Sequence, residues 1–271
     1  MDLEHLRLIL AEARKVSHHT EYLIAGSLSV LGVKADIPDA MSLSIDVDFY
    51  PLQDPGRAGE IARTLGEGSE FHAKYGYYLD PIHPELPTLP RSWRSRIVSH
   101  DFGDVTAVFL DVNDTAVSKY TRGAENDLRW IEAGYDAKIL DLGAITARAE
   151  RDTDFYDDEK QLTLHRIQMH RLSMLPDGTL SRPLLQYLKE HPSLDYTGVD
   201  TDAGHYTGSI LWSDGHHAVQ NLGRNQIAIH EVARLDSPPQ AYQQFSIRYS
   251  GGTATVTPPQ KLTQGRTLRP R

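Results

Sequence analysis

The segments YLIAGSLSVLG (22–32) and SLSIDVDFYP (42–51) decide the fold of the N-terminal half. The first places a Gly-Ser pair after a short apolar run, which predicts a strand leading directly into a helix that begins at Ser27. In the second, apolar and polar residues alternate, so Asp46 and Asp48 are expected on one face of a strand. Because glycine permits close approach to the backbone and a helix begins with free N–H groups, the pattern favours an anion site beside paired carboxylates.

The rest of the first half predicts helices and short strands in alternation, as in an α+β domain over residues 1–150. A third carboxylate, Asp80, is expected near the carboxyl end of a strand, from which it can join the first two. Carboxylates in this arrangement supply the hard oxygen ligands that Mg²⁺ prefers. The expected elements are helices at 2–15, 56–68 and 113–134, a strand at 74–82 and a hairpin at 94–112.

The composition is that of a globular protein of one or two domains, with 271 residues, 39% apolar and 24% charged. The chain has no cysteine, which excludes disulfides, thiolate zinc sites and cysteine nucleophiles and is compatible with a cytoplasmic location. No apolar run is long enough to cross a membrane, so no membrane association is expected. A formal net charge of −9 argues against non-specific coating of nucleic acid.

Three segments together resemble the DNA polymerase β-like nucleotidyltransferase superfamily: YLIAGSLSVLG, SLSIDVDFYP and DVNDTAVSKYTRGAENDLRWIEAG (111–134). Within it, the chain is most similar to minimal bacterial nucleotidyltransferases that include the abortive-infection toxins of type IV toxin–antitoxin systems. The resemblance covers roughly residues 15–150. It implies a nucleotidyltransferase fold, with a mixed sheet flanked by helices, and Mg²⁺-dependent transfer of a nucleoside monophosphate from an NTP.

By position, the resemblance implies that Asp46 and Asp48 hold the metal. It implies that Asp80 is the third carboxylate, which accepts the proton of the attacking hydroxyl or completes the metal site. Asp111 is the weaker candidate for this third position.

Nucleotide binding is implied for a second set of residues. Gly26 and Ser27 match the triphosphate-binding motif, and Lys119 matches a lysine that contacts nucleotide phosphates. The resemblance also implies that Lys119 and Asp127, the acid that follows it on the same predicted helix, are catalytic residues. If 113–134 is one helix, Asp127 lies about 80° round from Lys119 and can share a cleft wall with it.

The chain departs from the subgroup between these two positions, where Ala124 and Asn126 stand in place of basic residues. Arg122, one turn from Lys119, is the candidate to compensate as a nucleotide-binding cation. Fewer cations at the triphosphate predict weaker binding or altered activity.

The second half predicts a helical linker at 151–192, a small antiparallel β domain at 193–260 and a basic tail at 261–271. The span 204–258 resembles the KfrB domain of conjugative-plasmid proteins through its YTG, VQ, GR and YSG motifs. This resemblance implies a plasmid or mobile-element setting. Three polar residues, Gln220, Arg224 and His230, could form a site on one sheet face or serve turns and cross-strand contacts.

These observations predict an enzyme that transfers NMP to a hydroxyl of RNA, such as the 3′ end of tRNA, or of a protein. It would act as a plasmid-borne toxin with a cognate antitoxin. The alternatives are a degenerate transferase that binds without turnover, and a plasmid-maintenance or conjugation module in which the β domain and basic tail bind DNA or a protein.

Overall fold

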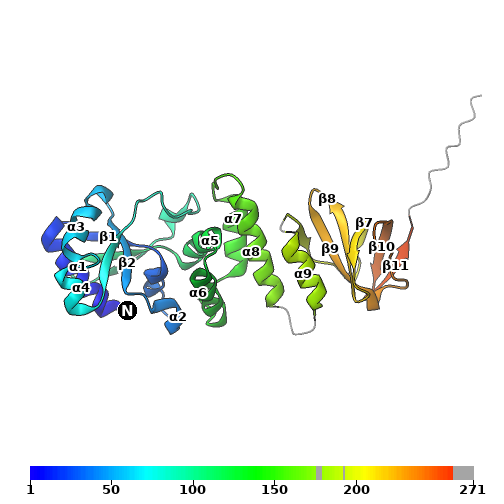
Figure 1. The fold of residues 1–271 in the computed structure, drawn as a ribbon, viewed down its shortest axis with the longest axis horizontal. Coiled ribbons are helices and arrows are strands. Elements are labelled where there is room, and N and C mark those ends of the chain that lie inside the picture. The colour runs from blue at the N-terminus through cyan, green and yellow to red at the C-terminus, as the bar shows by residue number, and fades with distance from the viewer. Residues whose placement is uncertain (175–178, 192, 259–271) are drawn as a thin grey trace, which may run out of the picture. The chain divides into compact units, whose positions relative to one another are not determined.

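The computed structural model describes residues 1–174, 179–191 and 193–258 (Figure 1). The chain divides into two compact units, Met1–Ile167 and Gln168–Arg271, and the division falls within helix α8 (Glu159–Ser173). The first unit therefore extends further along the chain than residue 150, where the sequence suggested its end, and includes the charged segment 151–160. The tail expected at 261–271 lies outside the described residues.

The first unit is built on a five-stranded mixed sheet in the order β3-β2-β1-β5-β4. Strand β1 pairs antiparallel with β2 and parallel with β5, β2 pairs parallel with β3, and β4 and β5 form the expected hairpin. The predicted α+β class is confirmed. The strands are β1 (Glu21–Ile24), β2 (Asp46–Pro51), β3 (Tyr78–Pro81), β4 (Val98–Asp101) and β5 (Thr106–Phe109).

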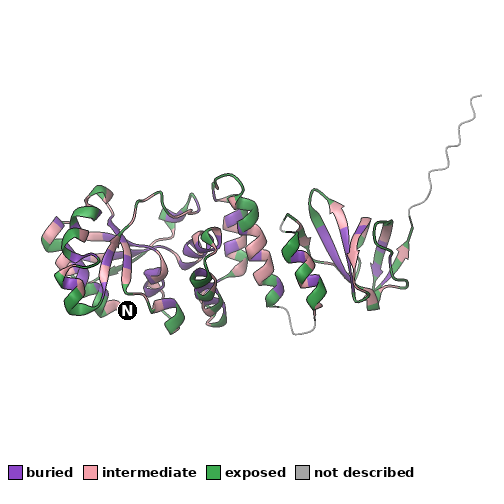
Figure 2. Ribbon diagram, viewed as in Figure 1, coloured by how far each residue is buried: buried purple, intermediate pink, exposed green. Residues whose placement is uncertain are grey.

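Two hydrophobic clusters hold this unit together, and the buried residues lie along the strands and the inner helix faces (Figure 2). The first joins α1 and α3 to the sheet, and the second joins α5, α6, α7 and the start of α8. The helices are α1 (Leu3–Ser17), α2 (Asp39–Ser42), α3 (Ala58–Leu65), α4 (Glu70–Tyr75), α5 (Val112–Arg122), α6 (Glu125–Asp136) and α7 (Leu142–Arg151), with 3₁₀ turns η1 (Ser27–Gly32), η2 (Pro55–Arg57) and η3 (Trp93–Ser95).

Strand β2 is shorter than the alternating segment that predicted it. The alternation begins at Leu43, but Leu43 and Ile45 are 76% and 57% exposed, and the core residues of the segment begin at Val47. Pairing with β1 and β3 begins at Asp46, so both aspartates of the motif still belong to the strand.

The single helix expected at 113–134 is wrong: the segment forms two helices, α5 and α6. Gly123 has φ 66°, a left-handed conformation that ends α5, and its N–H donates to the Lys119 carbonyl at 2.8 Å. Arg166 of α8 caps the same end by donating to the carbonyls of Tyr120 and Thr121, both at 2.7 Å. Gly123 was itself the local signal, because glycine is the residue that most often ends a helix in the left-handed conformation.

The second unit contains a six-stranded sheet in the order β11-β10-β7-β8-β9-β6. Its strand pairs are antiparallel except for β6 with β9, which is parallel. Helix α9 (Arg182–Glu190) packs Leu184 and Leu188 against Val219, Ile227 and Ile229. The strands are β6 (Asp195–Thr197), β7 (His205–Ser213), β8 (His217–Gly223), β9 (Gln226–Glu231), β10 (Gln244–Ser250) and β11 (Thr253–Thr257), with the 3₁₀ turn η4 (Val232–Arg234) after β9.

Candidate active site

The neighbouring strands β2 and β3 bring three predicted carboxylates together. Asp48 lies opposite Asp80 in the parallel register, and Asp46 lies two residues earlier on the same strand. One carboxylate oxygen from each of Asp46, Asp48 and Asp80 lies within 4.8 Å of the other two. The alternative third acid, Asp111, is elsewhere: it caps α5 through the N–H groups of Asn113 and Asp114.

The acid cluster carries negative charge that the protein only partly offsets. Burial, followed by the charges of Asp46 and Asp80, raises the pKa of Asp48 to about 6, while Lys119 and Arg122 oppose the shift. The Ser44 hydroxyl donates to Asp46 and orients that carboxylate. Three hard oxygen donors with excess negative charge suit a divalent cation such as Mg²⁺, whose remaining positions are usually filled by water and phosphate.

Gly26 fits tightly against the cluster. Its φ of 56° is in the left-handed range, and a Cβ at this position would overlap the Asp48 carboxylate. The chain is held there by a hydrogen bond from the Ala25 N–H to the Asp48 carbonyl at 2.9 Å. Glycine is therefore required both by the backbone conformation and by the Asp48 side chain beside it.

The short helix expected to begin at Ser27 is a 3₁₀ helix, η1. The Ser27 hydroxyl accepts a hydrogen bond from Lys119 Nζ at 3.1 Å. The Gly-Ser turn and the cation of α5 are thus in direct contact, although 92 positions separate the two residues in sequence. An anion bound beside Gly26 meets a backbone turn, a hydroxyl and an ammonium group.

Lys119 and Arg122 share one buried carboxylate, that of Asp127. Lys119 Nζ donates to Asp127 Oδ1 at 2.9 Å, and Arg122 donates through Nε to Oδ2 at 2.6 Å. Burial alone would raise the pKa of Asp127, but hydrogen bonds from Arg122 and Lys119 outweigh it and lower the pKa. Asp127 is fully buried, whereas the Arg122 side chain is 70% exposed, so Arg122 can turn toward a ligand while Lys119 stays fixed.

Trp130 completes the wall around Lys119 and was missed by the sequence-based prediction. Its Nε1 donates to the carbonyls of Ser27 and Met41, both at 3.1 Å, and Lys119 Nζ lies 5.0 Å from the ring centroid. A cation over an indole face is favourable, most of all where water is excluded. The sequence did contain a signal for this role, namely a tryptophan on the amphipathic helix that follows Lys119.

A pocket of about 340 Å³ opens beside the acid cluster. One side carries Gly26, Asp48, Lys119 and Arg122. The lining also includes an apolar wall, formed by the segment after β3 together with Leu110, which sequence reasoning did not single out. The pocket is lined by Ala25, Gly26, Asp48, Ile82, Leu86, Pro87, Thr88, Leu89, Leu110, Thr115, Ser118, Lys119, Thr121, Arg122 and Glu159.

A second pocket, of about 300 Å³, lies on the other side of Ser27. Asn126, one of the two departures from the subgroup, lines it and accepts a hydrogen bond from Arg129 at 2.5 Å. The other departure, Ala124, is the N-cap position of α6. The lining residues are Ser27, Ala40, Met41, Leu43, Ser44, Asn126, Arg129 and Trp130.

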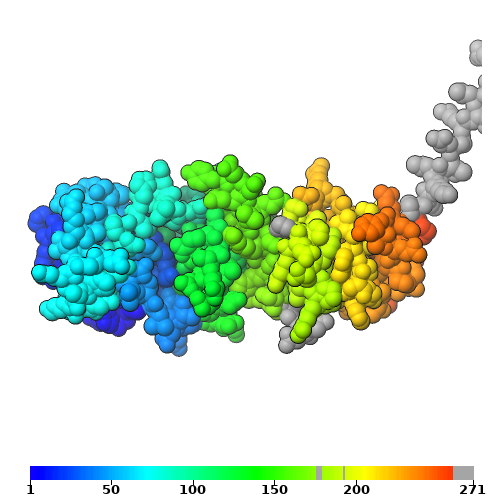
Figure 3. Space-filling view, viewed as in Figure 1, coloured from blue at the N-terminus to red at the C-terminus, as the bar shows by residue number. Residues whose placement is uncertain are grey.

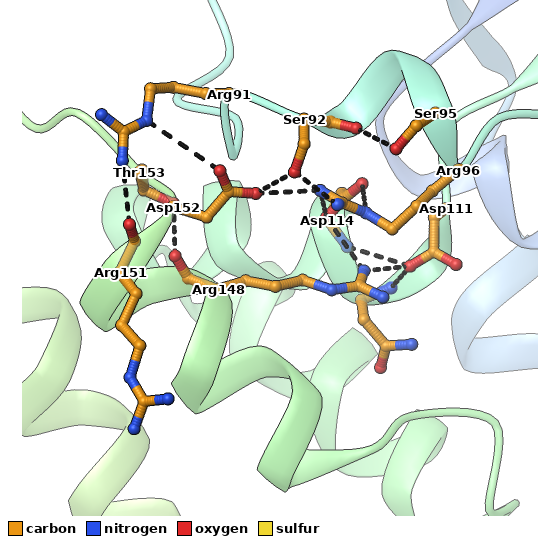
Figure 4. A network of polar contacts seen from close by, with 11 residues as sticks. Arg91, Ser92, Ser95, Arg96, Asp111, Asp114, Arg148, Arg151, Asp152 and Thr153 are labelled. Atoms are coloured by element: carbon orange, nitrogen blue, oxygen red, sulfur yellow. Dashed lines mark hydrogen bonds and ion pairs between the residues drawn. The ribbon is translucent and has the colours of Figure 1, made fainter.

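A network of ion pairs anchors residues 91–96, the chain that follows the apolar residues after β3 (Figure 4). The Asp114 carboxylate, fully buried on α5, accepts two hydrogen bonds from Arg96 and one from Arg148, each 2.9 Å long. Further along the loop, Ser92 donates to Asp152, and the Arg91 N–H donates to the Asp152 carbonyl at 2.6 Å.

The loop after β3 and the end of α7 consequently lie side by side, and a β-bridge between Pro90 and Thr153 joins them. Their surfaces adjoin in Figure 3. Local sequence patterns carry no sign of this pairing, because the partners are about 60 positions apart.

In the second unit, two of the three predicted polar residues meet. His230 is fully buried, with Nε2 3.0 Å from Gln220 Oε1 and Nδ1 3.0 Å from the Tyr249 hydroxyl. Gln220 Nε2 donates to the carbonyls of Gly208 and Phe245, so its Oε1 is the acceptor and His230 carries its proton on Nε2. Arg224 is not part of the cluster: it lies exposed in the β8–β9 turn with φ 51°.

A mixed sheet that presents three carboxylates beside a Gly-Ser turn and a buried lysine is the arrangement of a nucleotidyltransferase-type protein. A family model described as "Nucleotidyltransferase of unknown function (DUF6036)" matches residues 4–174, and the chain belongs to this family. A KfrB domain model matches residues 205–258. No curated protein and no solved structure gives a significant match. Among the described residues, no helix combines the length and apolarity needed to cross a membrane.

Proposed function

We propose that the first unit is a Mg²⁺-dependent nucleotidyltransferase that transfers NMP from an NTP to a hydroxyl group. The observation that carries this proposal is the convergence of Asp46, Asp48 and Asp80 beside Gly26 and Lys119. Carboxylates alone occur on many surfaces, and a lysine alone binds many anions. Together they provide a cation site and a phosphate site in one cleft.

In the reaction, the acceptor oxygen forms a bond to the α-phosphorus, and the bond from that phosphorus to the bridging oxygen of the β-phosphate breaks. Pyrophosphate leaves, and the hydroxyl proton passes to Asp80, the carboxylate that β3 contributes to the acid cluster. Lys119, Arg122 and the Ser27 hydroxyl bind the phosphate oxygens. Mg²⁺ held by the three carboxylates would neutralise charge that develops on the transferring phosphate.

We further propose that the acceptor is an RNA, with the tRNA 3′ end as the leading candidate and a protein hydroxyl as the alternative. A role as a plasmid-borne toxin with a cognate antitoxin in the cytoplasm is supported by the resemblance to the abortive-infection group and by the KfrB match. Growth arrest on expression that requires Asp46, with a change in tRNA length, would support this role.

Label transfer from each α-³²P-labelled NTP to total RNA and to total protein tests the activity. Transfer should require Mg²⁺ and be abolished by Asp46→Asn or Asp48→Asn. The control is Asp104→Asn. This substitution removes an exposed carboxylate that pairs with Arg14 at 3.1 Å and lies far in the sequence from Asp46 and Asp48. A protein that binds NTP but transfers no label to either pool would contradict the proposal.

The second candidate is a protein that binds nucleotide or a partner without turnover, within a plasmid-maintenance or conjugation module. It is favoured by the sharing of Asp127 between the two cleft cations, which leaves less free positive charge for a triphosphate. It predicts salt-sensitive DNA binding that survives Asp46→Asn and is lost on removal of residues 193–271.

A further inference from the structure

We propose that the apolar wall of the first pocket is the subsite for the nucleoside of the bound NTP. The wall consists of Ile82, Leu86, Pro87, Leu89 and Leu110. This inference rests on the proposed function and adds to it the side of the cleft on which base and ribose lie.

The position of the acid cluster favours this pocket over its neighbour. The nucleoside of an NTP is bonded to the α-phosphate, which is the group attacked and must lie at the metal site. The first pocket contains Asp48 and Gly26 together with the apolar wall. The second contains none of the three carboxylates, although Ser44 on its border contacts Asp46. A molecule with its α-phosphate at Asp48 therefore reaches the wall directly.

The chemistry of the pocket also matches a nucleoside. Its volume of about 340 Å³ lies in the range of roughly 300–1,000 Å³ typical of small-molecule sites. Leu86 is 71% exposed, so a base stacked on it would remove apolar surface from water. Thr88, Ser118 and Glu159 place polar atoms around the wall, where a base edge and ribose hydroxyls need partners.

The chain that directly follows the wall, residues 91–96, is anchored to the rest of the first unit. The Arg96–Asp114 pairs and the hydrogen bond from the Arg91 N–H to the Asp152 carbonyl tie the loop to α5 and α7 (Figure 4). A preformed surface lowers the entropy cost of binding. If this loop were not anchored, ordering it on binding would cost conformational entropy and would lower the affinity for the ligand.

The wall could instead bind the 3′-terminal nucleoside of an RNA acceptor, which has the same chemistry as the nucleoside of an NTP. The following test distinguishes these two ligands. Calorimetry with Mg²⁺ compares the affinity of a non-hydrolysable α,β-methylene NTP with that of tripolyphosphate, which has no nucleoside. The variants are Leu86→Ser in the wall and Leu43→Ser in the second pocket. These leucines are 71% and 76% exposed, so neither substitution should disturb folding.

The expected result is that Leu86→Ser lowers the affinity for the analogue about tenfold and leaves tripolyphosphate binding unchanged. Leu43→Ser should retain wild-type affinity for both ligands. The inference is overturned if Leu86→Ser leaves analogue binding intact, if only Leu43→Ser weakens it, or if Leu86→Ser raises KM for the RNA acceptor alone. Wild-type protein that binds neither ligand overturns the proposed function itself, whereas equal binding of both overturns only the nucleoside subsite.

Discussion

Lys119 and Asp127 form a buried ion pair of 2.9 Å between two helices that meet at a sharp break. On one continuous helix these side chains would point about 80° apart and could share only a cleft wall. The left-handed turn at Gly123 instead aims the start of α6 back at the end of α5. The pair fixes the ammonium group that also donates to Ser27, so Asp127 acts as a positioning residue for the phosphate site.

Asp127→Asn should lower the free energy of unfolding by about 3 kcal/mol, because it leaves Lys119 buried beside Arg122 without a counter-charge. Urea denaturation measures this effect. The double variant Lys119→Met/Asp127→Asn should lose less stability than the sum of the two single variants. Additive losses would show that the two side chains do not stabilise each other.

Asp114→Asn should also destabilise the protein by about 3 kcal/mol, since one buried carboxylate serves both Arg96 and Arg148. The matched control is Asp104→Asn, whose exposed pair with Arg14 should contribute less than about 1 kcal/mol. Thermal unfolding of the two variants in parallel provides the comparison. Equal effects on the midpoint would mean that the network is energetically no different from a surface ion pair.

Acid should destabilise the second unit through His230. Burial lowers the pKa of His230 to about 4, below the value near 6.5 expected in the unfolded chain. The unfolded state therefore takes up the proton first as the pH falls from 6.5 toward 4, and stability is lost over this window. Calorimetry should show a loss of about 2 kcal/mol between pH 7.5 and pH 5.

His230→Gln removes this titration, so its unfolding should depend less on pH across the same window. Substitution of the exposed His205 by glutamine is the control and should keep the wild-type dependence. A wild-type protein whose second unit unfolds equally at both pH values would contradict the assignment.

Gly26→Ala should displace the Asp48 carboxylate and weaken Mn²⁺ binding by at least about tenfold, because the added methyl group occupies the position of that side chain. Gly59→Ala on α3 is the control, since nothing lies within 4 Å of a Cβ there. Titration calorimetry with Mn²⁺ gives the affinities. Unchanged affinity in a folded Gly26→Ala protein would mean that Asp48 has room to move.

The hairpin and the shared face of Asp46 and Asp48 could be predicted from local patterns, because alternation and turn residues act over a few positions. The sequence also suggested Asp80, since the ends of neighbouring strands meet. What it could not show depends on contacts between distant segments. The partners of Asp114 and the wall at 82–89 arise only when the loop packs on α5 and α7.

The break at Gly123 was missed for a different reason. The apolar spacing continues across it, and the left-handed turn is stabilised by Arg166, more than forty positions later. A prediction from apolar periodicity treats one helix at a time. It cannot include a capping group that another helix supplies.

Arg166 bears on where the protein can be shortened. A fragment that stopped at residue 150 would keep every motif residue but would lose the guanidinium that closes the last turn of α5. The carbonyls of Tyr120 and Thr121 would then face water, and the turn that holds Lys119 and Arg122 could fray. The first unit therefore requires the chain at least as far as Arg166, and a fragment that ends at residue 150 should be less stable than one that includes α8 although it keeps every motif residue.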